Sequence, residues 1–153
     1  MHWEKLENRL LLSATSLQWQ TMASSPLTRA EGTKAVVNGQ MYVVGGFINS
    51  QLQVTKELDR YDPATNTWTR LADMPVPETH GASAVFGNDI WIAGFFFNNG
   101  ITASNLVYMY DTVANTWTQE PSLPAPVWGW TATSAEWAPP CCAVPISRNI
   151  AVC

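Results

Sequence analysis

Charged residues are scarce in this sequence, and the few basic ones are scattered. Asp, Glu, Lys and Arg together make up 13% of the 153 residues, and the formal net charge is −4 at pH 7. Domains that bind nucleic acid usually present clustered Lys and Arg to the phosphates. The composition therefore argues against a nucleic-acid partner.

Long hydrophobic runs are also missing. Nowhere do about 18 apolar residues follow one another, which is the length that a membrane-spanning helix needs. The N-terminal leader, residues 1–16, has only the short run Leu10, Leu11 and Leu12, and acidic residues precede it where a secretory signal has basic ones. We expect no membrane span and no conventional signal peptide.

Cysteine and histidine, which hold many protein-bound metals, are few and dispersed. Cys141, Cys142 and Cys153 all lie near the end of the chain, with spacings that match neither a zinc pair nor a disulfide framework. His2 and His80 have no second histidine, cysteine or carboxylate at ligand spacing. We predict no metal and no cofactor, and a hydrogen-bonding role for His80 at the entry to a repeat unit.

Catalytic signatures are absent from the sequence as well. It contains no nucleophile elbow, phosphate loop, dinucleotide fingerprint or His-Glu-x-x-His helix. A glycoside hydrolase needs two carboxylates facing each other across a pocket. The acidic residues are instead spread along the chain, mostly beside predicted turns: Asp59, Asp62, Asp73, Glu78, Asp89 and Asp111. We therefore predict no catalytic residue.

Aromatic residues, by contrast, are abundant and recur in register. The stretch from Tyr61 to Trp68 returns 49 residues later, from Tyr110 to Trp117, and the same step back from Trp68 leads to Trp19. A fixed period near 50 residues is typical of propeller blades and solenoid units, which bury their apolar faces against one another. We interpret the recurring aromatics as packing between neighbouring units.

Each unit, residues 26–74 and 75–123, alternates short strands with turn signals. In the first unit we expect strands at residues 35–37 and 41–44, a third ending at Tyr61 and a fourth at 68–71. Asn38-Gly39 is a strong hairpin signal, and residues 62–66 form a turn with Asp and Pro at favoured positions. Four short antiparallel strands per unit predict an all-β propeller.

The pattern resembles the kelch repeat. Its double glycine after the second strand is Gly45-Gly46, and its Tyr and Trp are Tyr61 and Trp68. The second unit carries Gly94, Tyr110 and Trp117, but Phe95 stands in place of the second glycine, where we expect a distorted turn. The resemblance covers about residues 17–135. It implies bacterial kelch-type blades similar to those of the central domain of galactose oxidase.

The ends of the repeat region fit pieces of two further blades. Residues 17–22 are expected as an outer strand, and residues 124–135 as the entry and inner strand of a third blade. The tail, residues 136–153, contains Pro139, Pro140 and Pro145 and leaves the pattern, so we expect it to be foreign to the fold. An incomplete ring with two complete blades is thus a fragment, a truncated frame or a protomer that self-associates.

The resemblance implies a non-catalytic module that binds a protein or a glycan through inter-strand loops. The candidate loops are residues 48–55 and 98–104, with candidate residues Asn49, Gln51, Asn98, Asn99 and Thr102. The alternative is a fragment of a carbohydrate-active kelch propeller, similar to galactose oxidase or to a sialic acid epimerase. The aromatics outside the register either line a binding face or cover a neighbouring blade: Phe95, Phe96, Phe97, Trp128, Trp130 and Trp137.

Residues 6–14 resemble a short segment near the N-terminus of large surface or secreted proteins of planctomycete-like bacteria. It reads Leu-Glu-Asn-Arg-Leu-Leu-Leu-Ser-Ala. The resemblance implies an extracellular or cell-surface location, with the cytoplasm as the alternative.

Overall fold

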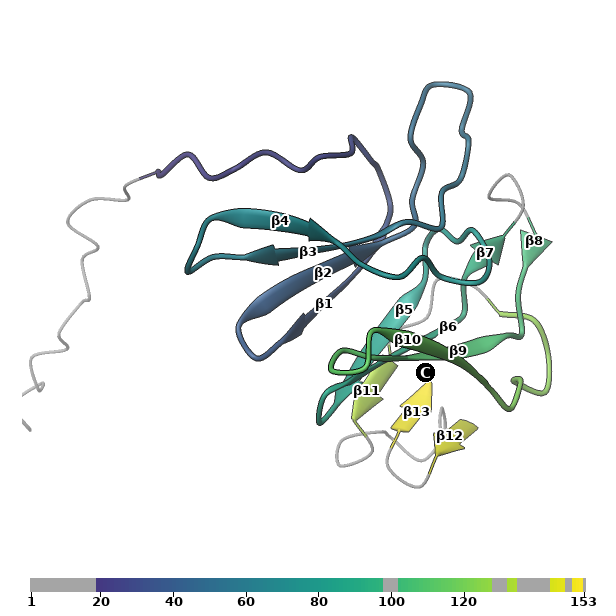
Figure 1. The fold of residues 1–153 in the computed structure, drawn as a ribbon. Helices are drawn as coiled ribbons and strands as arrows, with labels where there is room; N and C mark the ends of the chain where they lie inside the picture. The colour runs from purple at the N-terminus through teal and green to yellow at the C-terminus, as the bar shows by residue number, and fades with distance from the viewer. Residues whose placement is uncertain (1–18, 98–101, 128–131, 135–143, 148–149, 153) are drawn as a thin grey trace, which may run out of the picture.

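The named secondary-structure elements of the described residues are all β-strands, joined by turns and loops. The computed structural model describes residues 19–97, 102–127, 132–134, 144–147 and 150–152. Thirteen strands lie within these residues (Figure 1). In this part of the chain no helix has the length and hydropathy to cross a membrane. The predicted all-β fold class is confirmed.

Residues 33–70 form a four-stranded antiparallel sheet, which we call blade 1. Its strands are β1 (Thr33–Val37), β2 (Gln40–Val44), β3 (Leu58–Asp62) and β4 (Thr67–Arg70), in the order β1-β2-β3-β4. The strands lie where the turn signals predicted them, because Asn38-Gly39 supplies the two positive φ angles that a tight hairpin requires.

A second sheet, which we call blade 2, repeats this arrangement. It contains β5 (Ala82–Phe86), β6 (Asp89–Ala93), β9 (Val107–Asp111) and β10 (Thr116–Glu120), in the order β10-β9-β6-β5. Between β6 and β9 the chain adds a short hairpin of β7 (Phe96–Phe97) and β8 (Thr102–Ala103), where blade 1 has only an isolated antiparallel bridge between Phe47 and Val54. The two blades stand next to each other in Figure 1.

A third sheet follows blade 2. It consists of β11 (Ala132–Ser134), β12 (Val144–Ser147) and β13 (Ile150–Val152), with β13 in the middle. β11 lies where the inner strand of a third blade was predicted, and the tail adds the other two strands. Pro145 lies in β12, at the edge of the sheet, where a residue without an N–H group is tolerated.

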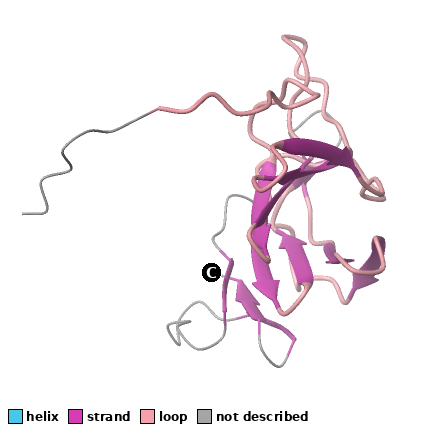
Figure 2. Ribbon diagram, turned by 60° about the vertical axis from the view of Figure 1, so that its left-hand side comes forward, coloured by secondary structure: helices cyan, strands magenta, loops and turns pink. Residues whose placement is uncertain are grey.

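The N-terminal segment departs from the prediction. Residues 19–25 form no strand, and the N-terminal part of this segment projects beyond the sheets in both views (Figure 1, Figure 2). Trp19 is 95% exposed. The predictions that residues 17–22 form an outer strand and that Trp19 packs between blades are therefore wrong for the described residues. An outer strand needs a third strand to pair with, and no described residues supply one here.

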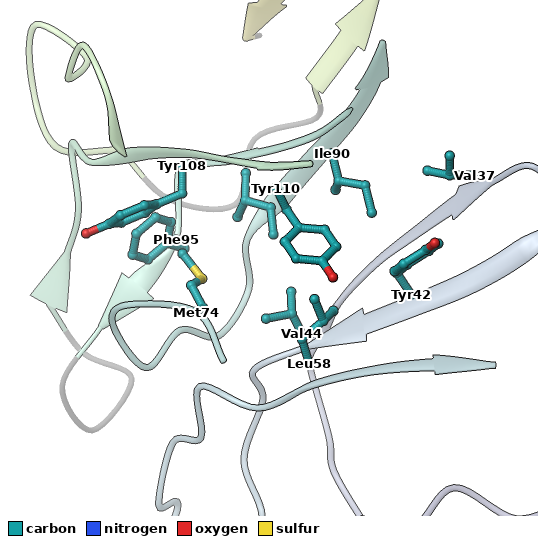
Figure 3. Packing of buried hydrophobic residues seen from close by; sticks show 10 residues of the cluster. Val37, Tyr42, Val44, Leu58, Met74, Ile90, Phe95, Tyr108 and Tyr110 are labelled. Carbon is teal, nitrogen blue, oxygen red and sulfur yellow. The ribbon is translucent and has the colours of Figure 1, made fainter. Parts of the chain in front are cut away.

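The main core lies between the two blades. Tyr110 of blade 2 is fully buried and points toward Tyr42, Val44 and Leu58 of blade 1 (Figure 3). The ring centroids of Tyr110 and Tyr42 are 6.2 Å apart. Burying a large apolar side chain contributes about 1.5 to 3 kcal/mol. The packing of one blade on the next is thus a principal source of stability.

The turn after the second strand differs between the blades, as the replacement of a glycine by Phe95 predicted. In blade 1, Gly45 and Gly46 have φ of 65° and 93°, and a Cβ on Gly46 would lie 2.6 Å from the Ala30 carbonyl oxygen. In blade 2, Phe95 takes a negative φ and its side chain is fully buried, 6.5 Å from the Tyr108 ring. Phe95 therefore belongs to the core and does not line a binding face.

The repeated stretch that contains Tyr61 and Trp68 holds the chain as it enters blade 1. Tyr61 Oη donates a hydrogen bond of 2.8 Å to Asn66 Oδ1, and the Tyr61 and Trp68 rings lie 5.0 Å apart. Asn66 Oδ1 also accepts from the Ala23 amide at 2.7 Å, while Trp68 Nε1 donates to the Ala23 carbonyl at 2.9 Å. Both backbone groups of Ala23 are thereby satisfied.

Blade 2 makes the same contacts one repeat later. Tyr110 Oη donates to Asn115 Oδ1 at 2.6 Å, the Ala72 amide donates to the same oxygen at 2.9 Å, and Trp117 Nε1 donates to the Ala72 carbonyl at 2.8 Å. Ala72 lies in the connection between the blades. The Asn and Trp of each blade thus hydrogen-bond both backbone groups of one residue in the segment that leads into it. The role of the repeated motif is structural.

Candidate functional site

The two ends of the blades differ in their connections. At one end the β1–β2 and β3–β4 turns are short. At the other, which we call the loop end, lie the longer β2–β3 connection of blade 1 (residues 45–57), the segments that enter each blade (26–32 and 71–81) and the β7–β8 hairpin (Figure 1). Long loops on a rigid scaffold are the usual place for recognition.

Backbone strain is concentrated at the loop end. Six non-glycine residues among those described have positive φ, and three of them are asparagines, which tolerate this conformation. The other three are Glu31 with φ of 58°, Leu52 with 56° and His80 with 58°. All three lie at the loop end. Residues in such conformations cluster at binding and active sites, so these three direct the search for a site to the loop end.

Glu31 and His80 form a pair across the two blades. His80 Nε2 lies 3.0 Å from Glu31 Oε2, and the His80 amide donates to the Glu31 carbonyl at 3.0 Å. Thr79 Oγ1 donates to the same carbonyl at 3.1 Å and lies 3.1 Å from His80 Nδ1. The predicted hydrogen-bonding role of His80 is confirmed.

No carboxylate lies at ligand spacing from His80 in the sequence, but the fold brings one to it. Glu31 lies 49 residues before His80 and so occupies the same position of the preceding repeat. Equivalent residues of adjacent blades stand side by side, because each blade is a copy of the last placed next to it. The repeat period was therefore the signal that could have predicted the pair.

Two equivalent phenylalanines flank the His80 ring. The Phe47 and Phe96 centroids lie 6.0 Å and 5.6 Å from it, in edge-on contacts with interplanar angles of 78° and 83°. The side chain of His80 is nevertheless 36% exposed and that of Glu31 is 51% exposed. The aromatic rings orient the pair while leaving it open to solvent.

A hollow of about 610 Å³ adjoins Glu31. Its wall includes Thr28, Glu31, Phe47, Ile48 and Leu52. It lies beside the β2–β3 connection, so the strained Glu31 and Leu52 both line the same space. This hollow is the candidate binding site of the described structure.

Arg29 also borders the hollow, but its charge is engaged inside the blade. Its side chain is only 6% exposed and is paired with Asp59. Arg29 Nη1 also donates to the carbonyls of Val43 and Glu57 at 3.1 and 3.0 Å. Desolvation lowers the pKa of Arg29, against the opposing effect of Asp59. Arg29 is therefore a structural ion and not a ligand group of the hollow.

The predicted loop residues have different roles in the structure. Asn49 Oδ1 accepts hydrogen bonds of 3.1 Å from the amides of Gln51 and Gln53, and Asn49 Nδ2 donates to Gln53 Oε1 at 3.0 Å. Asn49 therefore shapes the loop. Gln51 is exposed at its tip, and Thr102 is exposed in β8. Residues Asn98 and Asn99 lie outside the described residues, as do Trp128, Trp130, Trp137 and the three cysteines.

Glu78 is a fully buried carboxyl at the junction of the blades. Its Oε2 accepts a hydrogen bond of 3.0 Å from Thr33 Oγ1 of blade 1. Its backbone accepts from the Gly46 amide at 2.8 Å and donates to the Thr55 carbonyl at 3.2 Å. Burial raises the pKa of Glu78 to about 7, partly opposed by the hydrogen bonds from Thr33 and Gly81. Glu78 therefore links the two blades, and its burial keeps it out of reach of a ligand.

Metal-ligating groups do not converge within the part of the chain that the structure describes. There, no three His, Cys, Asp or Glu side chains lie together as they would to hold an ion. The Glu31 and His80 pair supplies two such groups, which is fewer than the three or more protein ligands of most zinc sites.

Comparisons with known proteins agree with the repeat. The family model described as the Kelch motif matches residues 28–75 and 79–124. Among solved structures, that of YjhT superposes with a TM-score of 0.63 and 18% sequence identity, over 75% of this chain. The chain spans 45% of the length of that structure, and at this identity the likeness concerns the fold. A sequence search of curated proteins finds no match.

Proposed function

Since this chain belongs to the kelch-repeat family, we propose that it is a non-catalytic binding module that recognises a protein or a glycan with the loop end of its blades. The propeller fold of this family is often used for protein interaction. Fold alone does not assign a function, so the proposal depends on the site.

The observation that carries the proposal is the clustering of strain at the loop end. Glu31, Leu52 and His80 all adopt positive φ there, and two of them line the hollow. Glycine at these positions would relieve a cost of about 1 kcal/mol or more at each. Side chains retained at such a cost, and exposed to solvent, are best explained by contact with a ligand.

A carbohydrate-active propeller enzyme is the second candidate, and the Glu31 and His80 pair favours it. A carboxylate 3.0 Å from an imidazole is a common acid–base couple. Both ring nitrogens of His80, however, already lie within 3.1 Å of Glu31 and Thr79 oxygens. Because a general base needs a nitrogen within reach of the substrate, binding without catalysis is the better-supported function.

The location and the assembly of the protein are further parts of the proposal. The N-terminal resemblance supports an extracellular or cell-surface location over the cytoplasm. Self-association to extend the ring is supported by the apolar side chains on the face of blade 1 that blade 2 does not cover, such as Val36, which is 63% exposed. A monomeric mass by light scattering together with a cooperative melt would contradict the self-association.

Binding to peptide and glycan arrays tests the function. We expect the purified chain to retain a ligand that is lost on the double substitution Gln51→Ala and Thr102→Ala at the loop end. The matched control is Val113→Ala, an exposed change in the β9–β10 turn at the opposite end. Equal loss in both variants would contradict a loop-end site, and chemical conversion of a bound glycan would establish the enzyme alternative.

A further inference from the structure

The geometry points to a basic side chain of a partner protein, Lys or Arg, as the group that the hollow beside Glu31 receives. This inference rests on the proposed binding function and deepens it by naming the chemistry of the ligand. It follows from the charge, the apolar walls and the hydrogen-bonding groups of the hollow.

The charge of the hollow is that of a single carboxylate. Of the side chains that line it in the described structure, only Arg29 and Glu31 carry a formal charge. Arg29 is buried and paired with Asp59, so its charge is balanced inside the blade. Glu31 accepts one contact from His80, whereas a carboxylate can accept about four hydrogen bonds. The half-exposed Glu31 therefore has capacity for a cationic donor.

The walls of the hollow suit the aliphatic stem of such a side chain. Phe47, Ile48 and Leu52 line it, and Leu52 is 55% exposed although it is apolar and holds a positive φ. Lys and Arg lay their methylene groups along apolar surface while the charged head finds a polar partner. A ring such as Phe47 also attracts a nearby cation. Contact with a basic side chain explains both unfavourable features of Leu52.

The same walls suit a glycan less well. A sugar ring needs several donors and acceptors to satisfy its hydroxyl groups. Asn49 Oδ1 already accepts two hydrogen bonds within the loop, which leaves chiefly Glu31 and the hydroxyl groups of Thr28 and Ser50 to meet them. An acidic group would meet the Glu31 carboxylate and be repelled. A basic side chain gains a charged acceptor from Glu31 and apolar flanks from the hollow, while its remaining N–H groups stay hydrated.

The test uses the full chain and an array of octapeptides. Each peptide carries Arg, Lys, citrulline, norleucine or Glu at one central position, with mixed uncharged residues elsewhere. We expect Arg and Lys peptides to bind about tenfold more tightly than citrulline peptides, since citrulline keeps the shape of Arg without its charge. The preference should weaken as salt is raised.

Two substitutions locate the preference. Glu31→Gln should abolish the preference for Arg over citrulline and leave the melting temperature unchanged. Asp73→Asn is the matched control, because it removes another partly exposed loop-end carboxylate, whose nearest cation, Lys56, lies 3.9 Å away. Glu31→Gly should also abolish the preference while raising the melting temperature, because glycine relieves the positive φ. A loss of the preference in Glu31→Gly together with a higher melting temperature could not be explained by a folding defect.

The outcomes separate this inference from the proposed function. Equal binding of Arg and citrulline peptides would overturn the assignment of a basic side chain as the ligand. A preference for Arg that Glu31→Gln leaves intact would overturn it as well. Peptides could also bind without any preference for a basic residue and lose this binding on the double substitution Gln51→Ala and Thr102→Ala. That result would overturn the basic side chain but support the loop-end function. A glycan whose binding depends on Glu31 would replace the basic side chain as the ligand. No binding on either array would contradict both.

Discussion

Blade 1 and blade 2 have the same architecture but differ in what covers the equivalent face. In blade 2 this face holds Tyr110, which is 0% exposed because it packs on blade 1. The equivalent Tyr61 of blade 1 has no described blade before it and stays partly exposed. Val36 is likewise 63% exposed and its counterpart Val85 37%. A repeated motif thus acquires its stabilising role only where a neighbour is present.

The same face is held together differently in the two blades. Blade 1 carries Asp59, which is paired with Arg29 and with Arg70, whose Nε lies 2.7 Å from Asp59 Oδ1. The corresponding residues of blade 2 are Tyr108, Glu78 and Gln119. Where blade 2 relies on apolar contact with a neighbour, blade 1 relies on an ion network of its own. Four predictions test this difference, from the largest expected effect to the smallest.

Truncation of the equivalent tyrosines, Tyr110 and Tyr61, should give the largest difference in stability between changes in the two blades. Tyr110→Ala removes a fully buried ring and should lower the free energy of unfolding by about 3 to 5 kcal/mol. Tyr61→Ala should lower it by about 1 to 2 kcal/mol, because the ring is already partly exposed. Urea unfolding of the two variants measures both values. Equal losses would show that a neighbour covers both faces in solution.

Removal of Asp59 should destabilise blade 1 by about 3 kcal/mol. Asp59→Ala leaves the buried Arg29 guanidinium without its counter-ion, and an uncompensated buried charge is costly. The double variant Asp59→Leu with Arg29→Met should recover most of this loss, because apolar residues of similar size replace a buried pair well. Failure of the double variant to exceed Asp59→Ala in stability would argue against the ion network.

Glu78 should make the blade junction sensitive to pH. Its pKa in the folded state is raised from 4.5 to about 7 by burial, so the folded state favours the protonated form. The stabilisation is fully present below pH 4.5 and is lost as the pH rises through about 7, by up to about 3 kcal/mol. Thermal melts across this range should show the decline. Glu78→Gln should remove it, and a decline that persists in that variant would assign it to another group.

Loss of the tryptophan hydrogen bond to the entering segment should have the smallest effect on the free energy of unfolding. Trp117→Phe removes the hydrogen bond from Nε1 to the Ala72 carbonyl and should lower the free energy of unfolding by about 1 kcal/mol. Trp68→Phe removes the equivalent bond to Ala23, which lies in the N-terminal segment and not between two blades. We expect a smaller loss there, measured by the same urea titration. A larger loss from Trp68→Phe would mean that the N-terminal segment is anchored more firmly than the blade connection.

Much of the blade could be predicted from local signals. The hairpin at Asn38-Gly39 and the strand ends at Gly45 and Tyr61 depend on backbone preferences of nearby residues, so the predicted strands agree with the structure. The pairing of Glu31 with His80 could not be found this way, because it joins residues 49 positions apart through the stacking of blades. Leu52 was missed because nothing in its residue type indicates a positive φ.

The sequence by itself determined the repeat, the four strands of each blade and the turn residues, because these follow from period, pattern and local conformational preference. Only the tertiary structure decided which copies of the motif are buried. Tyr110 lies in a core and Trp19 in solvent, although both occupy repeat positions, because burial depends on which blade stands alongside. The tertiary structure also brought Glu31, His80 and the hollow together, because contact between repeats depends on how blades are placed in space.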